Sequence, residues 1–183
     1  MSIINWVDFI MIVLFGIGVN SGRKSDFFTE LIILLGVLFA SCLSLHYYVR
    51  LGYWLSQNFV LPSRSQEILA FIALAGGTLG LTLLAKGGWL VILKIHLNRH
   101  IDNWGSLIFA VIKSYFLCGL VFFALMISGS PQIESASKQS ISFIVLKKSA
   151  LNVYSAFYAG FIGNFFAEES LNQKAFRMIQ ESR

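Results

Sequence analysis

Three ionisable residues lie inside long apolar stretches of the sequence: Asp8, Glu30 and Lys113. If these stretches are membrane-crossing helices, a charge near the middle of one costs about 2.5–3.5 kcal/mol even on a lenient scale. Charges in such places usually pair with another group or act on an ion, a proton or a substrate. We therefore take these three residues as the candidates for a functional role within the membrane.

The depths of the three residues predict one ion pair. Asp8 lies near the start of its stretch and Glu30 about one turn inside the start of the next. Lys113 lies roughly 13 Å along its own stretch, at about 1.5 Å per residue. Because a lysine can extend its charged end toward a shallower carboxylate, we expect Lys113 to approach Glu30. Pairing of Glu30 with Arg23 or Lys24 is the alternative.

No arrangement of residues typical of an active site is evident. His96 and His100 have the i, i+4 spacing of a helical metal pair with Asp102 nearby, but the metalloprotease glutamate and a third ligand are missing. The sequence also lacks a hydrolase triad pattern, a phosphate-binding glycine loop and paired catalytic carboxylates. We therefore expect no enzyme activity, no bound metal and no cofactor, and we interpret the two histidines as facing lipid headgroups.

The composition is that of a membrane protein. Of the 183 residues, 56% are hydrophobic and only 13% are charged, and the mean hydropathy is +0.72. Charged residues make up about a quarter of an average soluble domain, so this chain needs lipid as the solvent for its apolar side chains. The net charge is +5, but the 14 Lys and Arg are scattered between apolar runs. Such scatter is typical of loops beside anionic headgroups and not of a nucleic-acid interface.

Four apolar stretches are long enough to cross a bilayer as helices, which requires about 20 residues. We therefore predict an all-α fold, a polytopic transmembrane helix bundle in residues 1–130, followed by a C-terminal tail in residues 131–183. The four predicted spans are residues 3–20, 27–48, 68–85 and 104–128.

Two segments outside the spans are predicted as further helices. Residues 86–103 have leucines at helical spacing opposite Lys94 and Arg99, as expected of a helix lying in the interface, although they could equally extend the third span. In residues 149–167, which are uncharged and aromatic, polar and bulky apolar residues segregate into separate stripes. We favour a C-terminal amphipathic helix there over a fifth span, which stays the alternative.

The basic residues predict the orientation, because short connections rich in Lys and Arg face the cytoplasm. Together the first and third connections carry five Lys and Arg, whereas the second carries only two. We expect the first and third connections to be cytoplasmic and both termini to lie on the far side, the periplasm of a bacterium. The basic residues are Arg23 and Lys24 in the first connection, Arg50 and Arg64 in the second, and Lys86, Lys94 and Arg99 in the third.

Small residues recur at four-residue spacing in every predicted span. Helices in lipid associate by close contact across such residues, because no hydrophobic force draws them together. We expect these stripes to pack the bundle, with contacts within the chain favoured over contacts between subunits. The residues are Gly18 and Gly22 in the first span, Gly36, Ala40 and Ser44 in the second, Gly76 and Gly80 in the third, and Ser106, Ala110 and Ser114 in the fourth.

The order of these features resembles the colicin V production protein (CvpA) family of bacterial inner-membrane proteins. Trp6-Val7-Asp8-Phe9 is similar to the start of the family's first helix, and Gly22 to Glu30 to its basic, glycine-containing turn that ends in glutamate. Asp102 to Ser114 is similar to a third block, where the family has an aspartate, glycines at four-residue steps and a basic residue. The chain departs from the family pattern at Asp26 and Thr29 in the turn and at Ser106, Ala110, Lys113 and Ser114 in the third block.

The resemblance implies about four spans and an association with production or export of colicin V and with envelope upkeep, without an established biochemical activity. We therefore expect an accessory protein of the inner membrane, in contact with the lipid bilayer and not with nucleic acid. It would pack with itself as a homo-oligomer or with other envelope or secretion membrane proteins. The alternative is a small oligomeric transporter or channel in which Asp8, Glu30 and Lys113 line a path.

Overall fold

The computed structural model describes residues 5–59, 62–92, 99–128, 131–142, 145–146, 154–156, 158–162 and 172. The prediction of an all-α fold is confirmed, since within these residues the regular structure is helical and no strand is present. The helices are α1 (Trp6–Gly22), α2 (Phe27–Asn58), α3 (Ser63–Ile92), α4 (Arg99–Ile127) and α5 (Pro131–Lys138), followed by a short π-helical turn, η1 (Tyr158–Ile162).

Three of the helices are long and apolar enough to cross a membrane. They are α2, residues Ser65–Gly88 of α3 and residues Asp102–Ile127 of α4. The first helix, α1, is also apolar but has only 17 residues. That length is the lower limit of about 17–25 residues for a transmembrane helix. The chain is therefore a membrane protein with three long spans and one short one.

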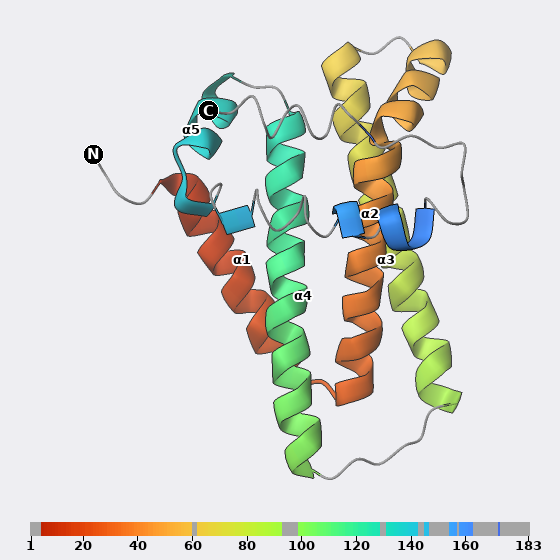
Figure 1. The fold of residues 1–183 in the computed structure, drawn as a ribbon, viewed down its shortest axis with the longest axis vertical. Coiled ribbons are helices and arrows are strands. Elements are labelled where there is room, and N and C mark those ends of the chain that lie inside the picture. The colour runs from red at the N-terminus through yellow and green to blue at the C-terminus, as the bar shows by residue number, and fades with distance from the viewer. Residues whose placement is uncertain are drawn as a thin grey trace.

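The helices α1 to α4 run alternately in opposite directions (Figure 1). The order of packing is α1, α4, α2 and α3, because α4 contacts both α1 and α2, and α2 makes its most extensive contacts with α3. We call the end of the bundle that carries the start of α1, the end of α4 and α5 the α5 end (Figure 1). The opposite end, called the turn end, carries the α1–α2 turn, the end of α3 and the start of α4.

Local sequence signals explain where the first helices begin. The side-chain oxygen of Asn5 accepts a hydrogen bond from the backbone N of Trp6, and the backbone N of Asn5 donates to Asp8, which is a capping box. Pro62 precedes α3, and its carbonyl accepts bonds from Ser65 and Gln66 in the first turn. Proline suits such a position because it lacks the N–H that a helix start leaves unpaired.

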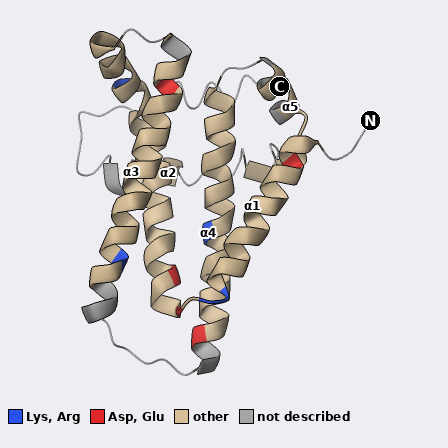
Figure 2. Cartoon of the chain, turned by 180° about the vertical axis from the view of Figure 1, so that it is seen from behind, with Lys and Arg blue, Asp and Glu red and all other residues tan. Residues whose placement is uncertain are grey.

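The helices extend beyond the predicted spans. Predicted to end at residue 48, α2 continues to Asn58, and α3 begins at Ser63 instead of residue 68. The predicted spans end where the apolar stretches give way to polar residues, but the helical hydrogen bonding continues past those points. Along the long helices most of the ribbon is neither acidic nor basic, as expected of segments in lipid (Figure 2).

The two predicted helices outside the spans had different outcomes. Residues 86–92 continue α3 and residues 99–103 begin α4, so the open alternative of an extended third span holds and no separate interfacial helix is seen among the described residues. Residues 93–98 lie outside the description. Most of residues 149–167 also do, and the described parts are a helical turn at 154–156 and η1. Whether this tail forms an amphipathic helix or a fifth span therefore stays a prediction.

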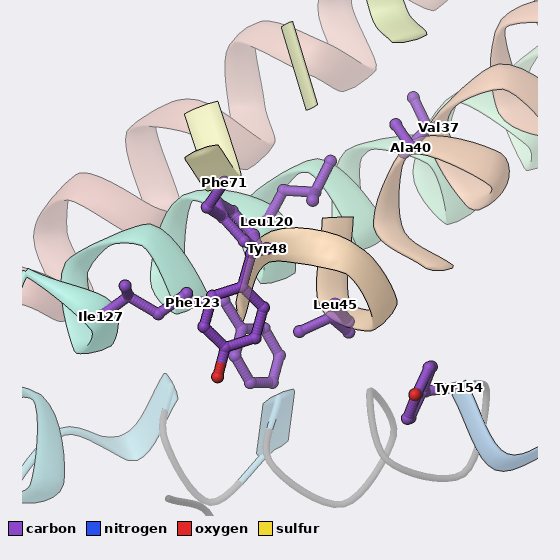
Figure 3. Close-up of a cluster of buried hydrophobic side chains, with 9 residues drawn as sticks. All are labelled: Val37, Ala40, Leu45, Tyr48, Phe71, Leu120, Phe123, Ile127 and Tyr154. Atoms are coloured by element: carbon purple, nitrogen blue, oxygen red, sulfur yellow. The ribbon is translucent and has the colours of Figure 1, made fainter. Parts of the chain in front are cut away.

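Two clusters of buried apolar side chains hold the helices together. The larger joins α2, α3 and α4, with Tyr48, Phe71 and Phe123 among its members, and it includes Tyr154 from the tail (Figure 3). The smaller joins α1 and α4 to the segment after α5 through Leu146. Leu146 and Tyr154 thus pack the tail against the bundle.

Candidate functional site

Lys113 in the middle of α4 and Glu30 in the first turn of α2 form a buried ion pair. The Nζ atom of Lys113 lies 2.5 Å from Oε2 of Glu30, and the exposed fractions are 4% for Lys113 and 0% for Glu30. The prediction that Lys113 approaches Glu30 is confirmed. The alternative partners, Arg23 and Lys24, are exposed in the turn.

Small residues of α1 and α4 enclose this pair. A Cβ added to Gly22 would overlap the methyl group of Ala110 and lie 3.4 Å from the carboxyl carbon of Glu30. Close packing of this kind excludes lipid and water, and attraction between opposite charges is stronger in such a medium. The second carboxylate oxygen, Oε1 of Glu30, is buried and has no hydrogen-bond partner among the described residues. The pair is thus one charge-assisted contact with one unsatisfied acceptor.

Asp8 joins α1 to the segment that follows α5. Its Oδ1 accepts bonds from the backbone N and the hydroxyl of Ser142, at 2.8 and 2.7 Å. Its Oδ2 accepts bonds from the backbone N of Ile141 at 3.3 Å and of Asn5 at 3.1 Å. Backbone N–H groups within the bilayer must find a partner inside the protein, and Asp8 supplies it for Ile141 and Ser142, two helical residues after α5. Asp8 therefore does not face Glu30 or Lys113 but anchors a different part of the chain.

A second hydrogen bond holds the same segment against α4. The hydroxyl of Tyr115 donates to the backbone carbonyl of Val145 at 3.0 Å. Together Asp8 and Tyr115 bond both N–H and C=O groups of the segment. The sequence identified Asp8 as a buried charge but not its partners, because they lie 133 and 134 residues along the chain.

Asp102 caps a helix other than its own. Its Oδ1 accepts a hydrogen bond from the backbone N of Phe27, the first residue of α2, at 2.7 Å. Asp26 occupies the N-cap position of α2 but makes no side-chain cap bond. A Cβ added to Gly105 would overlap the ring of Phe27, so α4 and the start of α2 are in close contact. Asp102 thereby fixes the start of α2, the turn that carries Glu30.

The structure adds nothing to the histidine pair considered as a metal site. His96 and the side chain of His100 lie outside the described part of the chain. Asp102, the acid near them in sequence, is used for the contact with Phe27. Among the residues that are described, no group of three or more His, Cys, Asp or Glu could hold a metal ion.

Most of the predicted small-residue stripes lie at contacts between helices. Gly18 faces Ser114, Gly22 faces Ala110, and Gly36 faces Thr82 of α3, each so closely that an added Cβ would overlap the facing side chain. The buried small residues on these faces are Ala40 and Ser44 of α2 and Ser106, Ala110 and Ser114 of α4. The hydroxyl of Ser44 is buried without a hydrogen-bond partner in the described part of the chain.

The stripe on α3 is different. Among the described residues, no atom outside the adjacent turns of α3 lies within 4 Å of a Cβ added to Gly76 or Gly80. The helix that carries them is the least buried of the three long spans. Four-residue spacing was a correct signal for packing on α1, α2 and α4, whereas on α3 it marks residues with open space beside them.

One contact had no signal in the sequence analysis. Nδ1 of His46 in α2 lies 2.8 Å from the hydroxyl of Tyr154, which also accepts a bond from the backbone N of Asn172 at 3.2 Å. The side chain of Asn172 donates to the carbonyl of Leu45 at 2.8 Å. These bonds attach described residues of the tail to α2, and their partners lie more than a hundred residues apart in the sequence.

Three of these contacts join separate elements of the bundle. Lys113, Asp8 and Asp102 each bond a group on another helix or segment, and such bonds hold helices in register within lipid. What this arrangement can do is fix the relative positions of α1, α2 and α4.

Comparison with known proteins gives one match. The model of a family described as colicin V production protein matches residues 7–151, a range that includes Asp8, Glu30, Asp102 and Lys113. Neither the curated proteins nor the solved structures give a match to the chain.

Proposed function

Because the chain belongs to the colicin V production protein family, whose model covers residues 7–151, we propose that it is an accessory protein of the bacterial inner membrane. It supports production or export of the toxin and upkeep of the envelope, and it has no catalytic activity of its own. It does so by presenting a fixed helix bundle to itself or to other membrane proteins. The partners are envelope or secretion proteins, in contact with the lipid bilayer.

One observation carries this proposal: the buried charged residues identified in the sequence form an ion pair or hydrogen bonds within the chain. Lys113 pairs with Glu30, and Asp8 accepts four hydrogen bonds. Charges that move ions or protons commonly line a pathway or a water-filled cavity. Here Glu30 and Lys113 are buried against one another, which supports a scaffold more than a path.

A second function, transport by an oligomer, has one observation in its favour. Oε1 of Glu30 is buried without a hydrogen-bond partner in the described structure, and an unsatisfied carboxylate oxygen is a place where a proton or cation could bind. Four spans would need several copies to enclose a pore. In this alternative, Glu30 and Lys113 would be the residues that bind the transported ion or proton.

Reconstitution separates the two functions. Purified protein in liposomes should show no ion or solute flux above empty liposomes, and a strain that lacks the gene should export less colicin V and have a leaky envelope. Flux that the Lys113→Met variant abolishes would establish the transporter and overturn the accessory role. The wild-type gene should restore export in the deletion strain.

We also propose that the turn end faces the cytoplasm, because Arg23 and Lys24 lie exposed there and Lys86 lies near the end of α3. In a cysteine-free background, Lys24→Cys should resist a membrane-impermeant maleimide added to cells with a permeabilised outer membrane. Gln57→Cys, exposed near the other end of α2, should react. The reverse pattern would invert the orientation.

A further inference from the structure

An apolar groove lies between α1, α4 and the segment after α5. Its volume is about 320 Å³, within the range of about 300–1,000 Å³ that is usual for ligand pockets. Met11 and Phe15 of α1, Cys118 of α4, and Val145 and Leu146 of the segment line it. We propose that this groove binds one acyl chain of a bilayer lipid.

The lining of the groove requires an apolar occupant. The polar groups at its upper end, Asp8 and Ser142, are hydrogen-bonded to each other, and the hydroxyl of Tyr115 is bonded to Val145. An occupant of the groove would therefore contact apolar side chains and polar groups that are already hydrogen-bonded within the protein. A polar solute would lose its hydration there without compensation, whereas a hydrocarbon chain loses none.

The position of the groove selects a lipid as the source of that chain. Ile12, which also lines the groove, is 62% exposed, and it continues into the apolar surface of α1 that includes Phe9 and Val13. In a membrane protein this surface contacts lipid, so the groove opens directly to the bilayer. It begins at Asp8, near the start of α1, so the lipid headgroup would lie at the α5 end of the bundle.

The length of the groove disfavours a helix as the occupant. Along α1 it runs from Asp8 to Phe15, which is about 10 Å at about 1.5 Å per residue. A helix that crosses the membrane is about 30 Å long and about 10 Å wide. A membrane-crossing helix of a second copy or of a partner would therefore contact the groove over only about a third of the length of that helix. A single flexible hydrocarbon chain is thinner than a helix and can occupy a groove of this length and volume.

Photolabelling of the full-length protein tests this assignment. The protein is placed in nanodiscs with phosphatidylethanolamine that carries a diazirine on one acyl chain, and labelled peptides are mapped by mass spectrometry after irradiation. Peptides that contain Met11 and the Val145–Leu146 pair should be labelled more than the peptide that contains Ile17. In Ile12→Trp, whose larger side chain fills the groove, labelling of Val145–Leu146 should fall about tenfold.

Ile17→Trp is the matched control, because Ile17 lies on the same helix, is also 62% exposed and does not line the groove. It should leave the labelling of Val145–Leu146 unchanged. Equal labelling of all lipid-facing peptides would show ordinary boundary lipid only and overturn the proposal. Disulfide-linked dimers of Ile12→Cys would place a second copy in the groove and overturn it as well. The wild-type labelling pattern decides the question even if Ile12→Trp fails to fold.

Discussion

Lys113 of α4 and Glu30 of α2 are joined by a 2.5 Å ion pair although they come from different depths of their helices. Glu30 lies in the first turn of α2, and Lys113 lies in the central part of α4. The lysine stem spans this difference, so the charges meet closer to the turn end than the lysine backbone does. The pair ties α2 to α4 beside Gly22 of α1.

Removing the lysine should destabilise the bundle more than removing both charges. Lys113→Met leaves the Glu30 carboxylate buried without its cation, and breaking a buried pair typically costs about 3–5 kcal/mol. The Lys113→Met, Glu30→Gln double variant leaves no uncompensated charge and should recover much of that loss. Thermal unfolding in detergent measures both. Lys24→Met, at an exposed lysine of the turn, should leave the melting temperature unchanged. Additive losses in the double variant would contradict the pairing.

Asp8→Ala should release the segment after α5 from α1. The change removes the acceptor for the backbone N of Ile141 and for both donors of Ser142. Hydrogen exchange at the amides of Ile141 and Ser142 should accelerate, since local opening exposes unbonded amides. Asp26→Ala removes a carboxylate without a side-chain cap bond and should leave these two amides protected. Unchanged exchange in Asp8→Ala would show that the apolar contact of Leu146 is sufficient.

Asp102 and Asp26 both lie at the start of α2, but only Asp102 accepts a hydrogen bond from its first backbone N–H. Loss of a helix cap usually costs about 0.5–2 kcal/mol, so Asp102→Ala should lower the free energy of unfolding by about that amount. Asp26→Ala should have little effect, although Asp26 is the residue that occupies the N-cap position of α2. Chemical unfolding of the two variants in parallel measures the difference. A larger loss in Asp26→Ala would show that Asp26 supplies the cap.

The sequence predicted features that depend on composition and on local spacing. Apolar stretches identified the helices, and the depths of Glu30 and Lys113 were enough to predict their contact, because a lysine reaches about a helical turn. Asp102, noted in the sequence as a neighbour of two histidines and as the start of a block similar to the family, caps α2 across a 75-residue separation. His46 and Tyr154 likewise meet across 108 residues. Such contacts depend on how the helices are arranged in space, and local spacing carries no information about that.

Glycine spacing correctly predicted helix packing on α1 and α2, where another helix faces the glycine, but not on α3. Replacing one glycine of each kind with alanine tests this difference. Gly22→Ala would place its methyl against the methyl and Cα of Ala110, and backbone there cannot rotate away. Overpacking of this kind typically costs about 1–3 kcal/mol. Gly76→Ala meets open space, and alanine is favoured over glycine in a helix by about 1 kcal/mol. Thermal unfolding should therefore show a lower melting temperature for Gly22→Ala and an equal or higher one for Gly76→Ala.

The double variant Gly22→Ala, Ala110→Gly provides the control for that comparison. Exchanging the two side chains restores the space that the added methyl needs, so stability should return toward that of the wild-type protein apart from the helix-propensity cost of glycine at position 110. Equal melting temperatures for Gly22→Ala and Gly76→Ala would mean that α1 does not pack against α4 at this point.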